Sequence, residues 1–192
     1  MSLENKNAIS YGAGGSIGGA VARTFAREGA TVFSAGRTLA SLEAVATDIK
    51  SAGGAADVAV LDALDEQAVD EHAQEAVSQS GSIDVSLNLI TRGDVQGTAG
   101  RYDYRGLHPA HHHRVTANFI SARAAARHMV EQGSGIILAL DSGSANGSPM
   151  MGSTVPADAA TDTFIRNLAA EIGLPRRTRS GHLDRWAPRD VP

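Results

Sequence analysis

A glycine-rich stretch near the amino terminus, YGAGGSIGGA (11–20), has the residue types and spacing of a phosphate-binding turn. Glycine lets the chain turn tightly and lets backbone N–H groups approach a pyrophosphate, and the amino terminus of a following helix adds a partial positive charge. We therefore predict a dinucleotide site here; the alternative is a glycine-rich turn that binds nothing. The residues predicted to hold the cofactor are Gly12, Gly14, Ser16, Ile17 and Gly18.

The ends of the next two apolar runs bear on which dinucleotide would bind. After ATVFSA the chain continues with Gly36 and Arg37, where an acidic residue would accept hydrogen bonds from the ribose hydroxyls of NAD. A cation there suits a 2′-phosphate, so the sequence favours NADP(H) over NAD(H), unless Arg37 is simply a solvated surface residue. Asp62 ends the following run and is expected either at the adenine edge or as a helix cap or loop acid.

These residues need a scaffold, and the sequence predicts alternating strands and helices. The expected strands are 7–12, 30–36, 56–62, 83–90 and 135–143, and the expected helices are 16–28, 39–53, 65–81, 115–133 and 157–173. This alternation predicts an α/β fold, a doubly wound parallel sheet in a three-layer α/β/α Rossmann-type arrangement. We expect one domain over 1–173 and an irregular tail over 174–192.

Composition excludes several classes of function. The 192 residues include no cysteine, which excludes disulfides, cysteine-ligated zinc and a thiol nucleophile. The net charge of −4 argues against a nucleic-acid partner, because phosphate binding requires a basic face. No apolar stretch approaches the roughly 18 residues of a membrane span, and the first ten residues lack a signal-peptide core. We predict a cytoplasmic protein with no membrane or nucleic-acid partner.

The order of these patterns resembles the short-chain dehydrogenase/reductase family over most of residues 5–173. The likeness is carried by the glycine turn and by AGRTLASLEAVA, IDVSLNLI, TANFISARAAARHM and GSGIILALDSGSA. The resemblance implies an NAD(P)-dependent oxidoreductase that acts on a small carbonyl or alcohol, such as a 3-oxoacyl compound. It also implies a homodimer or homotetramer formed through the outer helices. The alternative is a non-catalytic dinucleotide-binding or assembly protein on the same fold.

The resemblance assigns roles to particular residues. Asn88 would lie beside the cofactor, Asn118 would hold a water of the proton relay, and Ser142 would hydrogen-bond the substrate carbonyl. The structural alternatives are a polar helix-packing residue for Asn118 and a strand-end cap for Ser142. The family's catalytic tyrosine and lysine are replaced by Thr154 and Asp158, so we expect a divergent member with impaired activity. For Asp158 we favour an acid near a helix start that stabilises the helix dipole.

One segment, RYDYRGLHPAHHHR (101–114), departs from the pattern. Adjacent side chains on a helix point about 100° apart, so its three consecutive histidines cannot ligate one ion, and we predict no metal site. With suitable synonymous codons, reading 101–114 and 175–190 one base downstream gives family-like segments. We therefore predict that these stretches are frameshifted and that the last strands of the family's sheet are missing. The coding DNA tests this prediction.

Overall fold

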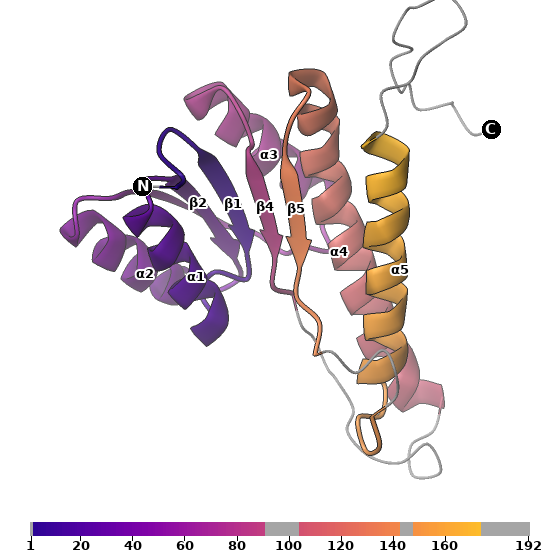
Figure 1. Ribbon diagram of the computed structural model, residues 1–192. Helices are drawn as coiled ribbons and strands as arrows, with labels where there is room; N and C mark the ends of the chain where they lie inside the picture. The colour runs from indigo at the N-terminus through magenta and orange to yellow at the C-terminus, as the bar shows by residue number, and fades with distance from the viewer. Residues whose placement is uncertain (1, 91–103, 143–147, 174–192) are drawn as a thin grey trace, which may run out of the picture.

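The computed structural model describes residues 2–90, 104–142 and 148–173 (Figure 1). This part of the chain contains five strands that alternate with five helices. In chain order they are β1 (Asn7–Tyr11), α1 (Ser16–Arg27), β2 (Thr31–Gly36), α2 (Leu39–Ser51), β3 (Ala55–Val60), α3 (Glu66–Ser80), β4 (Val85–Asn88), α4 (Tyr104–Gln132), β5 (Ile136–Ala139) and α5 (Thr154–Ile172). All ten predicted elements are therefore present, and the tail over 174–192 lies outside the described residues.

Three boundaries near the carboxyl end differ from the prediction. Helix α4 begins at Tyr104 rather than at 115, so the unusual histidine-containing segment is helical from that residue onward. Strand β5 ends at Ala139, three residues before Ser142. Helix α5 begins at Thr154 rather than at 157, because Pro156 fits the first turn of a helix, where no intrahelical N–H bond is needed.

The strands form one sheet in the order β3-β2-β1-β4-β5, and all neighbouring strands are parallel. The predicted doubly wound parallel sheet is confirmed. The chain order reverses direction between β1 and β4, which lie side by side with Tyr11 opposite Asn88. Asn88 in turn lies opposite Ala139 of β5. The carboxyl ends of β1, β4 and β5 are therefore neighbours, and such a switch point is where open α/β sheets bind ligands.

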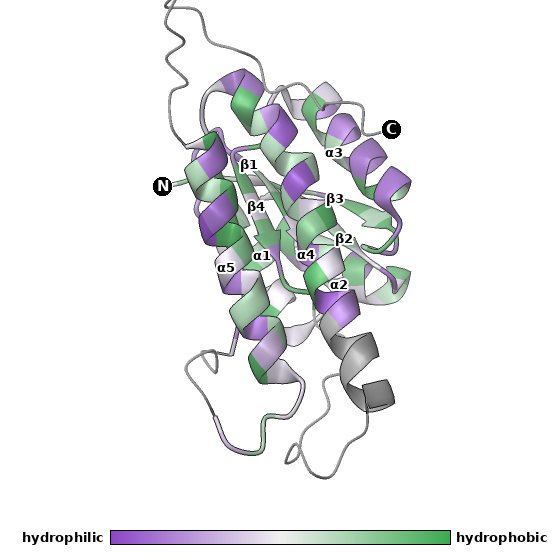
Figure 2. Cartoon of the chain, turned by 90° about the vertical axis from the view of Figure 1, so that its right-hand side faces the viewer, coloured by the Kyte–Doolittle hydropathy of each residue, from purple (hydrophilic) through white to green (hydrophobic). Residues whose placement is uncertain are grey.

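Helices cover the two faces of the sheet in separate groups. Helices α1 and α2 lie on one face, and α3, α4 and α5 lie on the other (Figure 1). Alternate residues of β1 supply both cores: Ile9 and Tyr11 pack toward α3 and α4, and Ala8 packs toward α1 and α2. Figure 2 shows the helices with mixed polar and apolar residues around the mostly apolar strands. This is the three-layer arrangement that the sequence predicts.

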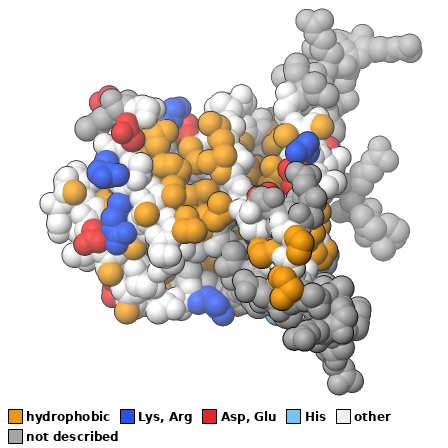
Figure 3. Space-filling view, turned by 60° about the horizontal axis from the view of Figure 1, so that its bottom comes forward, with side chains coloured by type: hydrophobic (Ala, Val, Ile, Leu, Met, Phe, Trp, Pro, Cys, Tyr) orange, Lys and Arg blue, Asp and Glu red, His pale blue; other side chains and the backbone are white. Residues whose placement is uncertain are grey.

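One part of the sheet carries exposed apolar side chains. Ile137 of β5 packs against the core beside α3 and α4, whereas its neighbours Ile136 and Leu138 are 57% and 43% exposed. Leu140, just after the strand, is also exposed. Hydrophobic side chains gather in the middle of the face drawn in Figure 3. A contiguous apolar surface of this kind favours association.

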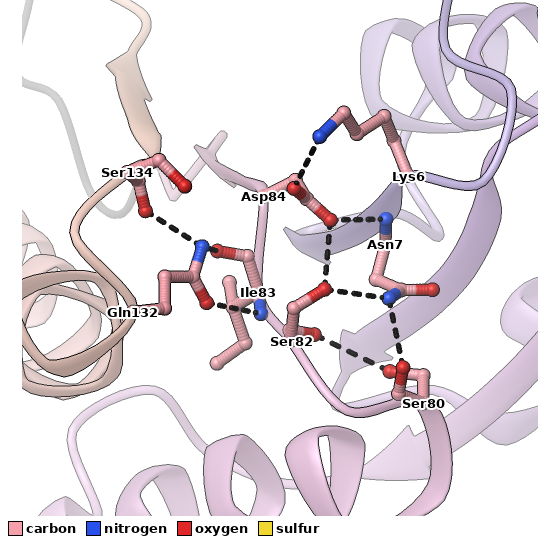
Figure 4. Close-up of polar contacts among 8 residues, drawn as sticks. All are labelled: Lys6, Asn7, Ser80, Ser82, Ile83, Asp84, Gln132 and Ser134. Carbon is pink, nitrogen blue, oxygen red and sulfur yellow. Dashed lines mark hydrogen bonds and ion pairs between the residues drawn. The ribbon is translucent and has the colours of Figure 1, made fainter.

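A polar network holds β4 beside β1 at the edge of the sheet where the strands begin, opposite the carboxyl ends of the strands (Figure 4). The Asp84 carboxylate accepts hydrogen bonds from Lys6 Nζ at 2.8 Å, from the Asn7 N–H at 3.0 Å and from Ser82 Oγ at 2.9 Å. Burial raises the pKa of Asp84, but these three hydrogen bonds outweigh it and leave the pKa below its ordinary value. These contacts stabilise the amino-terminal edge of the sheet, and the candidate site described below lies at the carboxyl edge.

Candidate functional site

The glycine turn packs closely against its neighbours at the switch point. Gly12 follows β1 with φ of +83°, and a Cβ added there would lie 2.5 Å from the carbonyl oxygen of Leu89, which follows β4. A Cβ on Gly18 would lie 2.9 Å from the Cα of Ala13. Neither position accepts a side chain without movement of the backbone. The two glycines therefore allow the turn, α1 and the end of β4 to approach one another.

The amino terminus of α1 has the features of an anion site. Gly15 is its N-cap and supplies no side-chain hydrogen bond, and the first turn contains no acidic residue. The first two helical residues, Ser16 and Ile17, are exposed, and Ile17 is 55% exposed although it is apolar. Both line a shallow hollow of about 400 Å³ on the outer face of the helix. The residues present therefore fit a diphosphate at the helix terminus.

Two predicted cofactor residues follow the next strands. Arg37 directly follows β2 and is exposed, and within the described part of the chain no residue pairs with its guanidinium. Asp62 lies in the turn after β3, where its carboxylate accepts the N–H of Leu64 at 2.9 Å. The cap of α3 is instead Asp65, which accepts from Ala68 N at 3.1 Å. Asp62 is thus not the cap of α3 but lies in the loop before it, and its contact with adenine stays a prediction.

Two buried asparagines lie near the carboxyl ends of the central strands. Asn88 ends β4 and is fully buried, and among the described residues its Nδ2 has no hydrogen-bond partner. Asn118 of α4 donates from Nδ2 to the carbonyl oxygen of Arg114 at 2.9 Å, and its Oδ1 has no partner in the same described set. Buried polar atoms without partners are uncommon and mark positions where a water or ligand group can bind.

A buried ion pair occupies the end of β5 between α4 and α5. Arg114 Nη2 lies 2.8 Å from Oδ1 of Asp158, and the side chains are 3% and 0% exposed. The same guanidinium donates to the carbonyl oxygen of Leu140 at 3.3 Å. Asp158 Oδ2 accepts the N–H of Ser142 at 3.1 Å and also the Ser142 hydroxyl. One carboxylate therefore joins both helices to the segment that follows β5.

This arrangement corrects the expected role of Asp158. The residue lies beyond the first turn of α5, which contains no acidic residue, and its carboxylate bonds to Arg114 and Ser142. The helix-dipole interpretation is therefore wrong, because the helix begins earlier and the side chain points into the protein. Thr154 is the first residue of α5 and is buried, and its N–H donates to the carbonyl oxygen of Met151 at 2.9 Å.

Sequence reasoning missed Arg114. The residue lies in the segment that departs from the family pattern, for which the resemblance implies no site residue. The available signal was its position four residues before Asn118, which places both residues on one face if the helix extends that far toward the amino terminus. Nothing in the sequence pairs it with Asp158, which lies on another helix.

Comparison with known proteins identifies the family. A family model described as enoyl-(acyl carrier protein) reductase matches residues 12–179. The 7alpha-hydroxysteroid dehydrogenase of Escherichia coli (strain K12) is 30% identical over 175 residues, which are 90% of this chain and 68% of that protein. The chain belongs to the short-chain dehydrogenase/reductase family.

Other comparisons agree with this membership. The short-chain reductase protein NovJ of Streptomyces niveus is 33% identical over 168 residues, which are 86% of this chain and 63% of NovJ. A solved structure of 7alpha-hydroxysteroid dehydrogenase with NADH and 7-oxo glycochenodeoxycholic acid has a TM-score of 0.81 at 28% identity. The match covers 89% of this chain and 67% of that one. The chain thus spans about two thirds of the length of these relatives.

The residues to which the family resemblance assigns a role lie at the carboxyl edge of the sheet. The glycine turn follows β1, Asn88 ends β4 and Ser142 lies three residues after β5, so all three lie toward the carboxyl ends of adjacent parallel strands, while their roles stay predictions. Thr154 and Asp158 lie at the start of α5, and Ser142 contacts the second of them. In the described part of the chain, no helix is long and apolar enough to cross a membrane.

Proposed function

We propose that this chain binds NADP(H) at the carboxyl edge of its sheet and acts on the carbonyl or alcohol group of a small molecule. The observation that carries the proposal is the glycine turn at the switch point, which brings α1 close to the strand ends and is followed by a helix amino terminus with no side-chain cap and no acidic residue in its first turn. The nicotinamide of the bound cofactor would supply the hydride chemistry. The chain's own residues bind, orient and exchange hydrogen bonds with the substrate.

The roles of the site residues follow from their positions. Ser142 is exposed, three residues after the end of β5, and would contact the oxygen of the substrate. Asn88 and Asn118 each have a buried amide atom without a partner among the described residues, which fits a role beside the cofactor and a bound water. Thr154 is a far weaker acid than tyrosine, so turnover should be slow; loss of a positioned acid costs about 10²–10⁴ in rate.

A substitution at Ser16 tests the cofactor site without disturbing the core. In Ser16→Glu a carboxylate at the helix amino terminus stabilises α1 but repels a diphosphate. Ser16→Gln is the matched neutral control, because it has nearly the same size. We expect NADPH fluorescence titration to show binding to the wild type and Ser16→Gln, and none to Ser16→Glu. Equal binding to all three variants, or to none, overturns the proposed site.

The choice of cofactor is tested at Arg37. Its exposed guanidinium lies beyond the end of β2, where the ribose of a bound dinucleotide is expected in this class of fold. Arg37→Ala should weaken NADPH binding about tenfold or more and leave NADH binding unchanged, because only NADPH carries the 2′-phosphate. If both affinities are unchanged, the preference for NADP(H) is wrong although the dinucleotide site can stand.

A second candidate function is dinucleotide binding without catalysis. It is favoured by the buried ion pair of Arg114 and Asp158 at the place where the family carries its tyrosine and lysine. Saturable NADPH binding without turnover on a panel of ketones and alcohols would select this function. Turnover on any member of the panel would select the reductase.

Self-association through α4 and α5 accompanies either function in this proposal. The two helices pack against each other, and Phe119 of α4 is 45% exposed beside Phe164 of α5, with ring centroids 5.4 Å apart. Sedimentation of the wild type and Phe119→Ser tests this surface. A homodimer or homotetramer that dissociates in the variant supports it, and an unchanged mass does not.

A further inference from the structure

The sheet face that carries α1 and α2 leaves β5 uncovered. Ile136 of β5 lies opposite Val85 of β4, which lies opposite Ala8 of β1, and Ala8 packs toward α1 and α2. Opposite side chains of a parallel sheet point to the same face and alternate residues share a face, so Leu138 points the same way. Within the described residues, the helices that pack on β5 are α4 and α5, on the other face (Figure 1). We name the exposed apolar residues Ile136, Leu138 and Leu140 the β5 face.

Helix α1 borders this uncovered area with an apolar side. Helix α2 lies against α1 at Gly19, where an added Cβ would meet Val45 of α2 at 3.0 Å. At about 100° per residue, Ile17 and Val21 lie about 160° around the helix from Gly19, away from α2 and toward β4 and β5. A shallow hollow of about 400 Å³ along α1 is lined by five uncharged residues, which we name the α1 face: Ser16, Ile17, Ala20, Val21 and Thr24.

We infer that these two surfaces bind a second copy of the chain, with the α1 face of each copy seated on the β5 face of the other. A contact about a twofold axis requires both of its halves on one surface, and here a helix side and an uncovered strand lie on the same face of the sheet. The halves match in chemistry, because neither contains a charged residue and both expose large apolar side chains, Ile17 at 55% and Ile136 at 57%. Ala20 is exposed and has only a methyl group, so another chain can approach α1 closely.

The opposite edge of the sheet has a different character. Strand β3 carries the exposed Asp57, and a charge on an edge strand opposes association. Strand β5 and Leu140 contain no charged residue. An uncharged surface also gives no attraction for nucleic acid or for anionic lipid, both of which require a basic face. The favoured occupant is therefore an equally uncharged protein surface, and the chain itself presents one.

The contact overlaps the proposed cofactor site. Ser16 and Ile17 belong to the α1 face, and they also begin the helix whose amino terminus would hold the diphosphate. A bound dinucleotide and a second copy of the chain therefore compete for the same end of α1. This competition rests on the proposed function, whereas the contact between α1 and β5 does not.

Cysteine cross-linking tests the contact, because the chain has no cysteine of its own. Ala20→Cys places a thiol on the α1 face and Leu138→Cys places one on the β5 face, and neither residue is in the predicted cofactor or catalytic set. The two variants, one of them lengthened by a tag, are mixed with a short bismaleimide. We expect product that contains one chain of each variant, and little product from either variant alone. Ala20→Cys mixed with Glu43→Cys, an exposed position on α2, is the control and should give little product.

Each outcome decides the inference. Product mainly from Ala20→Cys alone would show helix against helix, product mainly from Leu138→Cys alone would show strand against strand, and either result overturns it. No product, or a wild type that sediments as a monomer, overturns it as well. NADPH should reduce the mixed product severalfold, and an unchanged yield with NADPH bound in a fluorescence titration would remove Ser16 and Ile17 from the contact. If NADPH does not bind, the proposed cofactor site fails, while the cross-linking pattern without nucleotide still decides the contact.

Discussion

The buried ion pair makes a quantitative prediction about stability. Arg114 and Asp158 are 2.8 Å apart and almost fully buried, so Asp158→Asn removes the buried carboxylate that lies beside the guanidinium. Breaking such a pair costs about 3–5 kcal/mol. For a chain of this size each kcal/mol lowers the Tm by roughly 2–4 °C, so we expect a fall of about 6–20 °C.

The chain contains a matched control at its surface. Arg23 and Asp48 are also 2.8 Å apart, but their side chains are 40% and 59% exposed. Exposed pairs contribute about 0–1 kcal/mol, so Asp48→Asn should change the free energy of unfolding little. Urea unfolding followed by far-UV circular dichroism measures both variants under one set of conditions. The two pairs match in residue type and distance, and they differ in burial and in the further hydrogen bonds that Asp158 accepts from Ser142.

The double variant completes the test. Arg114→Leu with Asp158→Asn replaces two buried charges by neutral groups, and it should recover most of the loss of the single variant. If Asp158→Asn costs no more than Asp48→Asn, the pair is not desolvated as described. If the double variant is as unstable as the single one, the loss comes from packing rather than from an unpaired charge.

Three further predictions concern the rest of the chain. Burial lowers the pKa of His72 to about 4, so the unfolded state binds more protons than the folded state between pH 6.5 and 4. The free energy of unfolding should therefore fall by about 2–3 kcal/mol from pH 7.5 to 4.5, and His72→Phe should flatten this dependence in urea titrations. The folded-state pKa of Asp84 is lowered, so its contribution to the free energy of unfolding is present above the unfolded-state pKa and is lost as the pH falls through the folded-state pKa. Asp84→Asn should lower the free energy of unfolding by about 1–3 kcal/mol at pH 7, and an unchanged free energy would contradict the network of Figure 4. Ile136→Thr with Leu138→Thr should reduce self-association in sedimentation experiments, and an unchanged mass would show that the exposed apolar residues of β5 do not mediate self-association.

The fold was predictable because its signals are local. The glycine turn, the apolar strands and the helical periods each lie within a few residues, and parallel strands joined by helices admit few arrangements. The edge at which three predicted site residues lie was predictable for the same reason. Gly12 directly follows β1, Asn88 ends β4 and Ser142 lies three residues after β5, and the carboxyl ends of neighbouring parallel strands lie at one edge.

The tertiary structure alone decided what replaces the family's tyrosine and lysine. Asp158 looked like a helix-start acid in the sequence, since that pattern is local and stabilising. In the structure it is paired with Arg114, which lies 44 positions earlier on another helix, and with Ser142, which lies 16 positions earlier. A buried charge requires a partner, but the sequence does not show which charge will be brought beside it. Composition and periodicity therefore determine the scaffold, whereas packing between α4 and α5 determines the electrostatics of the site.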